Sequence, residues 1–244
     1  MKTFITDKNC SDKYTIIRLD TADSTNTHLL SLARSGAAHG TVVIAREQTA
    51  GRGRRGRSFL SPAGGLYMSV LLRQLPYDDC SVMTAAAAVA FRRALQSFSD
   101  ETIGIKWVND LMINGKKTAG ILAEGVISAD ARFEGMVIGV GVNLTEPPAE
   151  VADIACALPG NITCDQAAHA LLNSLDEVLD MPLEKVIDEY RQFSAAIGHR
   201  VTVVTPTGEY EALAADIDQR ARLICITDDG QRTALDSGEI RIRL

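Results

Sequence analysis

The most constraining feature of the sequence is the segment TAGRGRRGRSFLSP at residues 49–62, in which glycines separate four arginines. Residues 40–47 before it and 64–73 after it are rich in apolar and β-branched side chains, a pattern that predicts two strands. The arginines therefore belong to a loop held between two strands, a position where binding residues are common. Three interpretations compete: a nucleic-acid contact, a phosphate-gripping loop of an enzyme, and a solvated surface turn.

The composition bears on the first interpretation. The chain has 244 residues and a net charge of −6 at pH 7. Non-specific nucleic-acid binding depends on many cations that neutralise phosphates. This acidic balance therefore argues against a dedicated nucleic-acid-binding protein, although it leaves room for one local basic site. The length suits one large domain, alone or with a small appendage.

The cysteines and the N-terminus indicate the compartment. The cysteines are scattered and form no Cys-x-x-Cys pair, which is typical of free thiols in a reducing compartment; they are Cys10, Cys80, Cys156, Cys164 and Cys225. The first residues contain no apolar run of the kind found in a signal peptide. No stretch reaches the roughly 18 uninterrupted apolar residues of a membrane helix. We therefore expect a cytoplasmic protein with no membrane partner.

Helix and strand patterns are mixed along the rest of the chain. Amphipathic periodicity and capping residues predict helices over residues 23–36, 77–98, 163–180 and 182–196. Further strands are predicted over residues 102–107, 118–127 and 132–144, with a tight Asn-Gly hairpin turn at residues 113–116. After Gly198, short strands recur between turn signals, as in a small appended barrel or sandwich.

Two other segments place polar groups and glycines among strand residues. In KWVNDLMINGKKTAGILAEG (106–125), the polar side chains of Lys106, Asn109, Asp110 and Lys117 interrupt apolar runs. They could belong to solvated turns, or Lys117 could begin a buried strand and point into a pocket. In GVGVNL (139–144), the glycines suggest close approach by a ligand or a neighbouring backbone. Each segment alone leaves both interpretations open.

Five segments occur together in one order: DSTN (23–26), EQTAGRGRRGRSF (47–59), GGLYMSVLLR (64–73), KWVNDLMINGKKTAGILAE (106–124) and GVGVNL (139–144). In this combination the sequence resembles the biotin protein ligases, the biotin–acetyl-CoA-carboxylase ligase family, over almost its whole length. The resemblance implies an α+β fold. A class II synthetase-like catalytic domain, with a mixed, largely antiparallel sheet flanked by helices, would span residues 1–196. A small β-barrel similar to Src-homology-3 domains would span residues 197–244.

The resemblance also implies a two-step reaction. Biotin and ATP, with Mg²⁺, form biotinyl-5′-adenylate and pyrophosphate, and a lysine of a biotin carboxyl carrier protein then accepts the biotin. A carboxylate that attacks an anionic triphosphate needs cations to offset the repulsion. A glycine-rich loop that folds over the adenylate would exclude water from it. We therefore expect residues 51–57 to be poorly ordered without ligand and ordered with it.

The family's site residues carry over by position. The implied catalytic residues are Lys117, Arg54 and Asp110, and Asp110 is also the implied Mg²⁺ ligand. The implied biotin-binding residues are Ser24, Thr25, Asn26, Gln48, Arg52, Gly53, Arg54, Lys117, Gly120, Leu122, Gly139 and Gly141. The implied ATP- and adenylate-binding residues are Arg52, Arg54, Arg55, Arg57, Phe59, Asn109, Lys117 and Asn143.

Three departures from the family pattern affect these expectations. Val108 stands where proline is common, which predicts a less rigid strand end. Phe59 replaces a common tryptophan and offers less area for stacking on adenine. The catalytic motifs begin almost at the start of the chain, which predicts a short form without the N-terminal DNA-binding domain of bifunctional members, and hence no DNA binding.

Partners and alternatives remain open at this point. An edge strand such as 132–142 could pair with the carrier or with a second subunit, so a homodimer is one option. The nearest alternative function is a lipoate or octanoate ligase on the related scaffold. A nucleic-acid-binding module is a remote alternative.

Overall fold

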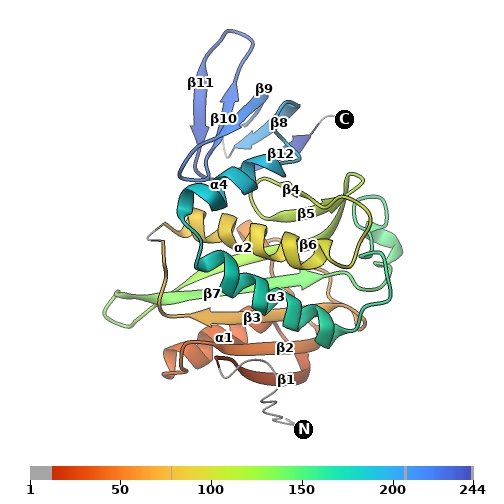
Figure 1. Ribbon diagram of the computed structural model, residues 1–244, viewed down its shortest axis with the longest axis vertical. Coiled ribbons are helices and arrows are strands. Elements are labelled where there is room, and N and C mark those ends of the chain that lie inside the picture. The colour runs from red at the N-terminus through yellow and green to blue at the C-terminus, as the bar shows by residue number, and fades with distance from the viewer. Residues whose placement is uncertain (1–12, 78, 206–207, 243–244) are drawn as a thin grey trace.

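The computed structural model describes residues 13–77, 79–205 and 208–242. It contains a large sheet with the order β1-β2-β3-β7-β6-β5-β4 and a smaller one with the order β11-β10-β9-β8-β12 (Figure 1). The strands of the large sheet are β1 (Thr15–Ala22), β2 (Thr41–Gln48), β3 (Leu66–Leu72), β4 (Gly104–Lys106), β5 (Asp110–Ile113), β6 (Lys116–Ile127) and β7 (Phe133–Val142). Those of the small sheet are β8 (Arg200–Thr205), β9 (Gly208–Ile217), β10 (Leu223–Ile226), β11 (Arg232–Leu235) and β12 (Glu239–Ile242).

The large sheet is mixed, as expected. Strands β1 and β2 are parallel, and every other neighbouring pair is antiparallel. The Asn-Gly hairpin joins β5 to β6, with positive φ angles of 49° at Asn114 and 78° at Gly115. The expectation that residues 132–142 form an edge strand is wrong, because β7 is hydrogen-bonded to β3 on one side and to β6 on the other. The strands at the two ends of the sheet are β1 and β4.

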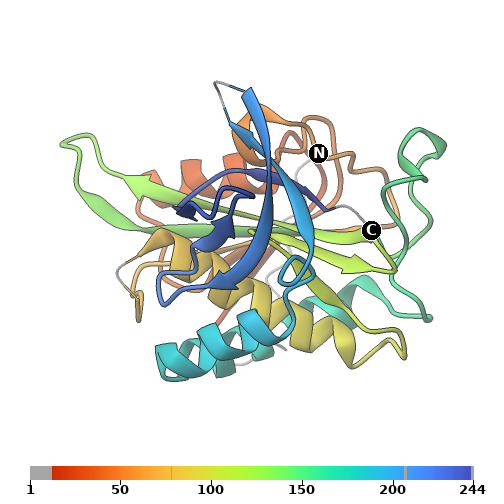
Figure 2. The same ribbon diagram turned by 90° about the horizontal axis from the view of Figure 1, so that it is seen from above.

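Helices cover both faces of this sheet. Figure 2 shows α1 (Thr25–Arg34) on one face, and α2 (Cys80–Gln96), α3 (Cys164–Leu179) and α4 (Leu183–Gln192) on the other. The alanine-rich stretch of α2 is fully buried, because small side chains let this helix pack closely on the sheet and on α3. Helix α1 begins at Thr25 because the side chain of Ser24 caps it. The first turn of α1 lies beside β3 and β6, because Asn26 is hydrogen-bonded to Ser69 of β3 and to Leu122 of β6.

The core has two parts. The larger cluster fills the space between the sheet and α2, α3 and α4, and it extends into the small sheet. The smaller cluster lies under α1 and consists of Leu29, Leu30, Ala33, Val43, Leu71, Val126 and Val137. The two clusters hold the sheet rigid between its helical layers, so that loops at its end are presented on a fixed frame.

The small sheet is antiparallel throughout. Its all-β character and its place after α4 agree with the expected α+β class. Within the described residues its order has two ends, β11 and β12, so the hydrogen bonds do not close a full barrel. The boundary between residues 196 and 197 remains a prediction.

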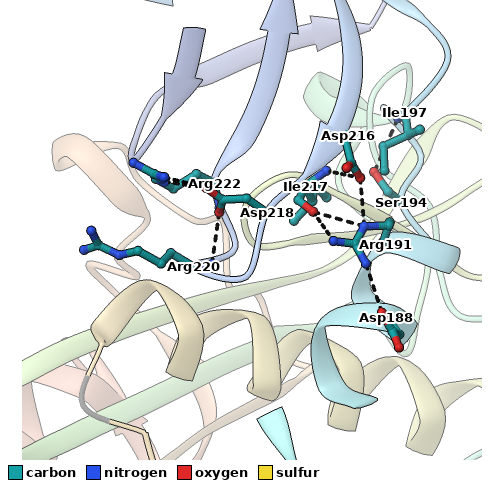
Figure 3. A network of polar contacts seen from close by, with 9 residues as sticks. All are labelled: Asp188, Arg191, Ser194, Ile197, Asp216, Ile217, Asp218, Arg220 and Arg222. Carbon is teal, nitrogen blue, oxygen red and sulfur yellow. Dashed lines mark hydrogen bonds and ion pairs between the residues drawn. The ribbon is translucent and has the colours of Figure 1, made fainter. Parts of the chain in front are cut away.

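Polar contacts join the small sheet to the larger body. Figure 3 shows Arg191 of α4 donating from Nε to the carboxylate of Asp216 at 2.7 Å and to the carbonyl of Ile217 at 3.0 Å. Arg220 reaches the α2 cap Asp79 at 3.1 Å. These contacts fix the small sheet against α4 and the start of α2.

Two other expectations concern cysteines and membranes. Cys80, Cys156, Cys164 and Cys225 are free thiols, and Cys10 lies outside the described residues. None of the helices in the described part of the chain combines the length and the apolarity that crossing a bilayer requires.

Candidate active site

One cavity of about 850 Å³ lies at the end of the large sheet that faces the small sheet. Its wall contains the first turn of α1, the arginine loop, parts of β6 and β7, the segment 145–155 and residues 238–241 of the small sheet. Every site residue that the sequence implied lines it, from Ser24 on α1 to Asn143 after β7. The structure thus brings together in space five segments that are far apart along the chain.

The arginine loop folds back on itself through its backbone. The amide of Phe59 donates to the carbonyl of Gly51 at 2.8 Å, and the amide of Gly53 donates to the carbonyl of Arg57 at 2.7 Å. A Cβ atom on Gly51 would lie 2.3 Å from the carbonyl oxygen of Phe59, so only glycine fits there. Arg55, at the tip, has a φ of 55°. The glycine spacing therefore builds a compact turn that displays the arginines.

Carboxylates hold three of the cations at this site. Arg52 pairs with Glu124 at 2.9 Å, and Lys117 pairs with Asp110 at 2.6 Å. Arg57 pairs with Glu239 of the small sheet. These pairs reduce the net positive charge of the cavity and fix the directions of the side chains.

Arg54 has a different environment. Its Nη1 atom lies 3.5 Å from two neutral acceptors, the side-chain oxygen of Asn109 and the carbonyl of Gly238. Burial lowers the pKa of Arg54, the neighbouring Arg55 lowers it further, and Asp110 acts in the opposite direction. Among the described contacts Arg54 has no carboxylate partner, so an anionic ligand would satisfy it best.

Glycines on β6 and β7 make room for the side chains over the sheet. A Cβ atom on Gly120 would lie 2.7 Å from Nζ of Lys117, and one on Gly141 would lie 2.5 Å from the ring of Phe59. Nζ of Lys117 lies 5.3 Å from the centre of the Phe59 ring, within the range of a cation–π contact. The edge of the Phe59 ring meets Tyr67 at 6.5 Å between ring centres. Phe59 is thus held between the glycine strands and the lysine.

The first turn of α1 carries a buried polar network. The backbone amide of Thr25 donates to Oε1 of Gln48 at 2.8 Å, and Nε2 of Gln48 donates to Ser61 at 2.7 Å. The side-chain amide of Asn26 donates to the carbonyl of Leu122 at 3.1 Å and to Glu124 at 2.9 Å. These side chains are therefore pre-oriented before a ligand arrives.

Several of these residues escaped the sequence analysis. Glu124 shares a face of β6 with Gly120 and Leu122, so the alternation of strand residues could have revealed it. Ser61 and Ser69 are small polar residues that gave no signal. Glu239 belongs to a strand 182 residues after Arg57, and only the docking of the small sheet brings it here.

The structure offers little for a metal held by the protein alone. Among the described residues, no group of three or more His, Cys, Asp or Glu side chains could hold a metal ion. The carboxylates at the cavity are those of Asp110, Glu146, Asp153 and Glu239. Mg²⁺ commonly takes one or two carboxylates, with phosphate oxygens and water completing its shell. Asp110 therefore fits an ion carried by a nucleotide, rather than a resident metal.

Family models identify the class to which this fold and cavity belong. Residues 19–143 match the biotin/lipoate A/B protein ligase family, and residues 196–243 match the biotin protein ligase C-terminal domain. The chain belongs to the biotin protein ligases, and it is therefore a ligase enzyme. The resemblance inferred from the five motif segments is confirmed.

Individual relatives agree with this assignment. The chain is 33% identical over 235 residues to the biotin–[acetyl-CoA-carboxylase] ligase of Mycobacterium tuberculosis, a match that covers 89% of this chain and 85% of that protein. It is 33% identical over 232 residues to the bifunctional ligase/repressor BirA of Bacillus spizizenii, covering 88% and 70%.

Solved structures share the fold. The Aquifex aeolicus biotin protein ligase in complex with biotin and ATP superposes with a TM-score of 0.81 at 24% identity, covering 93% of this chain and 98% of that one. A Helicobacter pylori biotin acetyl coenzyme A carboxylase synthetase with bound biotinylated ATP gives a TM-score of 0.67 at 20% identity, covering 93% and 99%. At these identities the likeness concerns the fold alone.

Proposed function

We propose that the enzyme activates biotin with ATP as biotinyl-5′-adenylate and then transfers the biotin to a lysine of a biotin carboxyl carrier protein. The observation that carries this proposal is one cavity with two chemically distinct ends. The polar network on the first turn of α1 forms one end. Arg54, beside Asn109 and Gly238, and Lys117, beside Asp110, form the other. A volume of about 850 Å³ is large enough for a vitamin joined to a nucleotide.

The end at α1 suits the ureido ring and the aliphatic chain of biotin. Ser24, Thr25 and Gln48 offer hydroxyl and amide groups that can exchange hydrogen bonds with a ureido group. Leu122 and the glycines of β7 provide an apolar wall for the chain that follows the ring. Buried polar groups arranged in this way discriminate against a ring that offers no hydrogen bonds, such as a dithiolane.

The cationic end suits the first step. A carboxylate oxygen of biotin attacks the α-phosphorus of ATP, the bond to the β-phosphate oxygen breaks, and pyrophosphate leaves with the electron pair. Arg54 and Lys117 are positioned to offset the charge of both anions. Arg55 and Arg57 line the same cavity, and Arg52 lies nearer the α1 turn, paired with Glu124. Mg²⁺ that arrives with ATP would share this charge, with Asp110 as its protein ligand. Phe59 and Asn109 would contact the adenosine, and Asn143 lines the wall beside Lys117.

The second step needs an amine at the open side of the cavity. The neutral lysine amine attacks the carbonyl carbon of the mixed anhydride, and the bond from that carbon to the phosphate oxygen breaks. AMP leaves with the electron pair, and the nitrogen loses a proton to solvent as the amide forms. Asp110 lines the cavity beside Lys117 and would orient the incoming amine. The relative from Mycobacterium tuberculosis is named for acetyl-CoA carboxylase, which supports a carrier domain of a biotin-dependent carboxylase as the acceptor. The cytoplasmic location of the reaction remains part of the proposal.

Biotin-dependent exchange of radiolabelled pyrophosphate into ATP tests the first step. We expect exchange in the wild type and loss of it in Lys117→Ala and Arg54→Ala, with circular dichroism unchanged. The matched controls are Lys185→Ala on α4 and Arg132→Ala in the β6–β7 turn, both exposed and away from the cavity. Exchange at the wild-type rate in both active-site variants would contradict the charge-offset mechanism.

Mass spectrometry of a carrier domain tests the second step and the choice of acid. The enzyme is incubated with ATP, the carrier and either biotin, lipoate or octanoate. We expect the mass of biotin on one carrier lysine. Addition of lipoate or octanoate instead would establish the alternative function on the related scaffold.

A further inference from the structure

Two polar relays connect the first turn of α1 to the two ends of the arginine loop. One runs from Thr25 through Gln48 and Ser61 to the carbonyl of Phe59, where the loop ends, with a final distance of 2.9 Å. The other runs from Asn26 through Glu124 to Arg52, where the loop begins. Both relays start at residues that line the proposed biotin pocket.

The second relay is built around the side chain of Asn26. Both hydrogens of its amide nitrogen are used, by the carbonyl of Leu122 and by Glu124. The hydroxyl of Ser69 donates to its Oδ1 atom at 2.6 Å. Because both ends of this amide are bonded within the protein, its orientation is fixed, and Glu124 is fixed with it.

Glu124 is an acid that does not line the cavity itself but contacts two residues that do, Asn26 and Arg52. Its side chain is only 20% exposed. Its two oxygens meet both terminal nitrogens of Arg52, at 2.9 and 3.3 Å, and one of them also accepts from Asn26. A carboxylate here repels an anionic ligand. Its presence beside the cavity therefore suggests a second role. The geometry points to that role, since Glu124 contacts both the pocket residue Asn26 and the loop cation Arg52. Arg52 also lies 3.5 Å from the hydroxyl of Thr27, on the same turn of α1 as Asn26.

We propose that Glu124 is a positioning residue that couples the biotin pocket to the arginine loop, through Asn26 on one side and Arg52 on the other. This inference rests on the proposed function, because biotin is the ligand whose arrival it transmits. A ligand against the α1 turn keeps Asn26 and Glu124 in place, and Glu124 keeps Arg52 and the start of the loop over the cavity. Without the carboxylate of Glu124, biotin still enters the pocket, but Arg52 and the start of the loop are no longer held over the cavity.

Limited trypsin digestion measures this coupling, because the loop offers four arginines to the protease. In the wild type, saturating biotin should slow cleavage at the loop. In Glu124→Gln, which keeps the size but loses the charge, this protection should fall about 10-fold or more, because charge-assisted hydrogen bonds to Arg52 are lost. The KM for biotin in pyrophosphate exchange should rise by a similar factor of about 10. The matched control is Glu134→Gln on β7, an acid near Arg73 at 3.8 Å and outside the cavity.

Arg52→Lys provides a second variant, because the Arg52 side chain is 46% exposed and its replacement should leave the fold intact. It keeps the charge but loses the two-pronged contact, so it should reproduce the loss of protection. In the double variant the two losses should not add, since both break one link. Wild-type protection and KM in Glu124→Gln, or wild-type protection in Arg52→Lys, would overturn the coupling. If the wild type itself shows no biotin-dependent exchange, the proposed function fails instead.

Discussion

The ammonium of Lys117 lies 2.6 Å from the carboxylate of Asp110, across the neighbouring strands β6 and β5. Under the proposed mechanism Lys117 contacts the reacting phosphate. Because Asp110 holds the ammonium by this ion pair, the acid sets the position of the lysine. Misplacing a catalytic group by about 1 Å can reduce a rate about 100-fold.

Asp110→Asn should therefore separate rate from affinity. We expect kcat for pyrophosphate exchange to fall about 10- to 100-fold, because the neutral amide holds Lys117 less firmly. The KM for ATP should change little, because removing a negative charge makes the cavity more attractive to phosphates while the loss of the proposed Mg²⁺ ligand acts in the opposite direction. Steady-state exchange kinetics at varied ATP measure both quantities. Asp130→Asn, in an exposed ion pair with Arg132, is the control. An unchanged kcat with a raised KM for ATP in Asp110→Asn would contradict the role of Asp110 in holding Lys117.

Gly139 should be intolerant of even one methyl group. A Cβ atom there would lie 1.9 Å from Oδ1 of Asn26, whose amide cannot turn without breaking its bonds to Ser69 and Glu124. We expect Gly139→Ala to weaken biotin binding about 10-fold or more by isothermal titration calorimetry, since one to three hydrogen bonds are lost. The control is Gly104→Ala in β4, where the added Cβ would meet its nearest neighbour at an ordinary 3.5 Å. Equal affinities in the two variants would show that Asn26 moves freely.

Trp107 should report on the docking of the small sheet. It is the single tryptophan of the chain, it lines the cavity, and its Nε1 donates to the carbonyl of Ala221 at 3.0 Å. We expect Trp107→Phe to lower the free energy of unfolding by about 1–3 kcal/mol, because the buried carbonyl loses its donor. Urea unfolding followed by circular dichroism measures the change.

In the wild type, adding biotin with ATP should change the tryptophan fluorescence, and a constant spectrum at saturation would refute that expectation.

Cys225 should make the protein less stable at high pH. Burial raises the pKa of this thiol to about 11, above its usual value of 9.0. The folded state therefore keeps a proton that the unfolded state releases, so the contribution is present below about pH 9 and is lost as the pH rises toward 11. We expect the wild type to lose about 2 kcal/mol more than Cys225→Ala between those limits. Denaturant unfolding of both proteins at several pH values measures this difference, and parallel pH profiles would show that the thiol does not contribute.

The cavity was more predictable from the sequence than its supports were. Residues 51–57 consist only of glycine and arginine, an unusual composition. Arginine side chains bind anions, so the residue types themselves indicate a phosphate-binding loop. Glu124, Ser61 and Ser69 support other side chains from common strand positions, so no local pattern distinguishes them. The hairpin at Asn114 followed from local turn chemistry, which acts over a few residues.

The fold showed the same division between local and distant causes. The helices followed from periodicity and caps, whereas the α+β class came from the resemblance of the motif segments to a known family. Strand β1 was missed because it is an end strand with only Ile16 and Ala22 buried, so its apolar pattern is weak. The place of β7 inside the sheet depends on which strands pair, and periodicity along one strand does not encode that choice.

The contact between Arg57 and Glu239 makes the small sheet part of the candidate active site. A protein that ended after α4 would keep every glycine and arginine of the loop, yet Arg57 would lose its acid and Arg54 the carbonyl of Gly238. Exchanging the small sheet for that of a relative should therefore alter nucleotide affinity rather than only stability. In engineering terms, the two sheets form one catalytic unit and cannot be treated as separable modules.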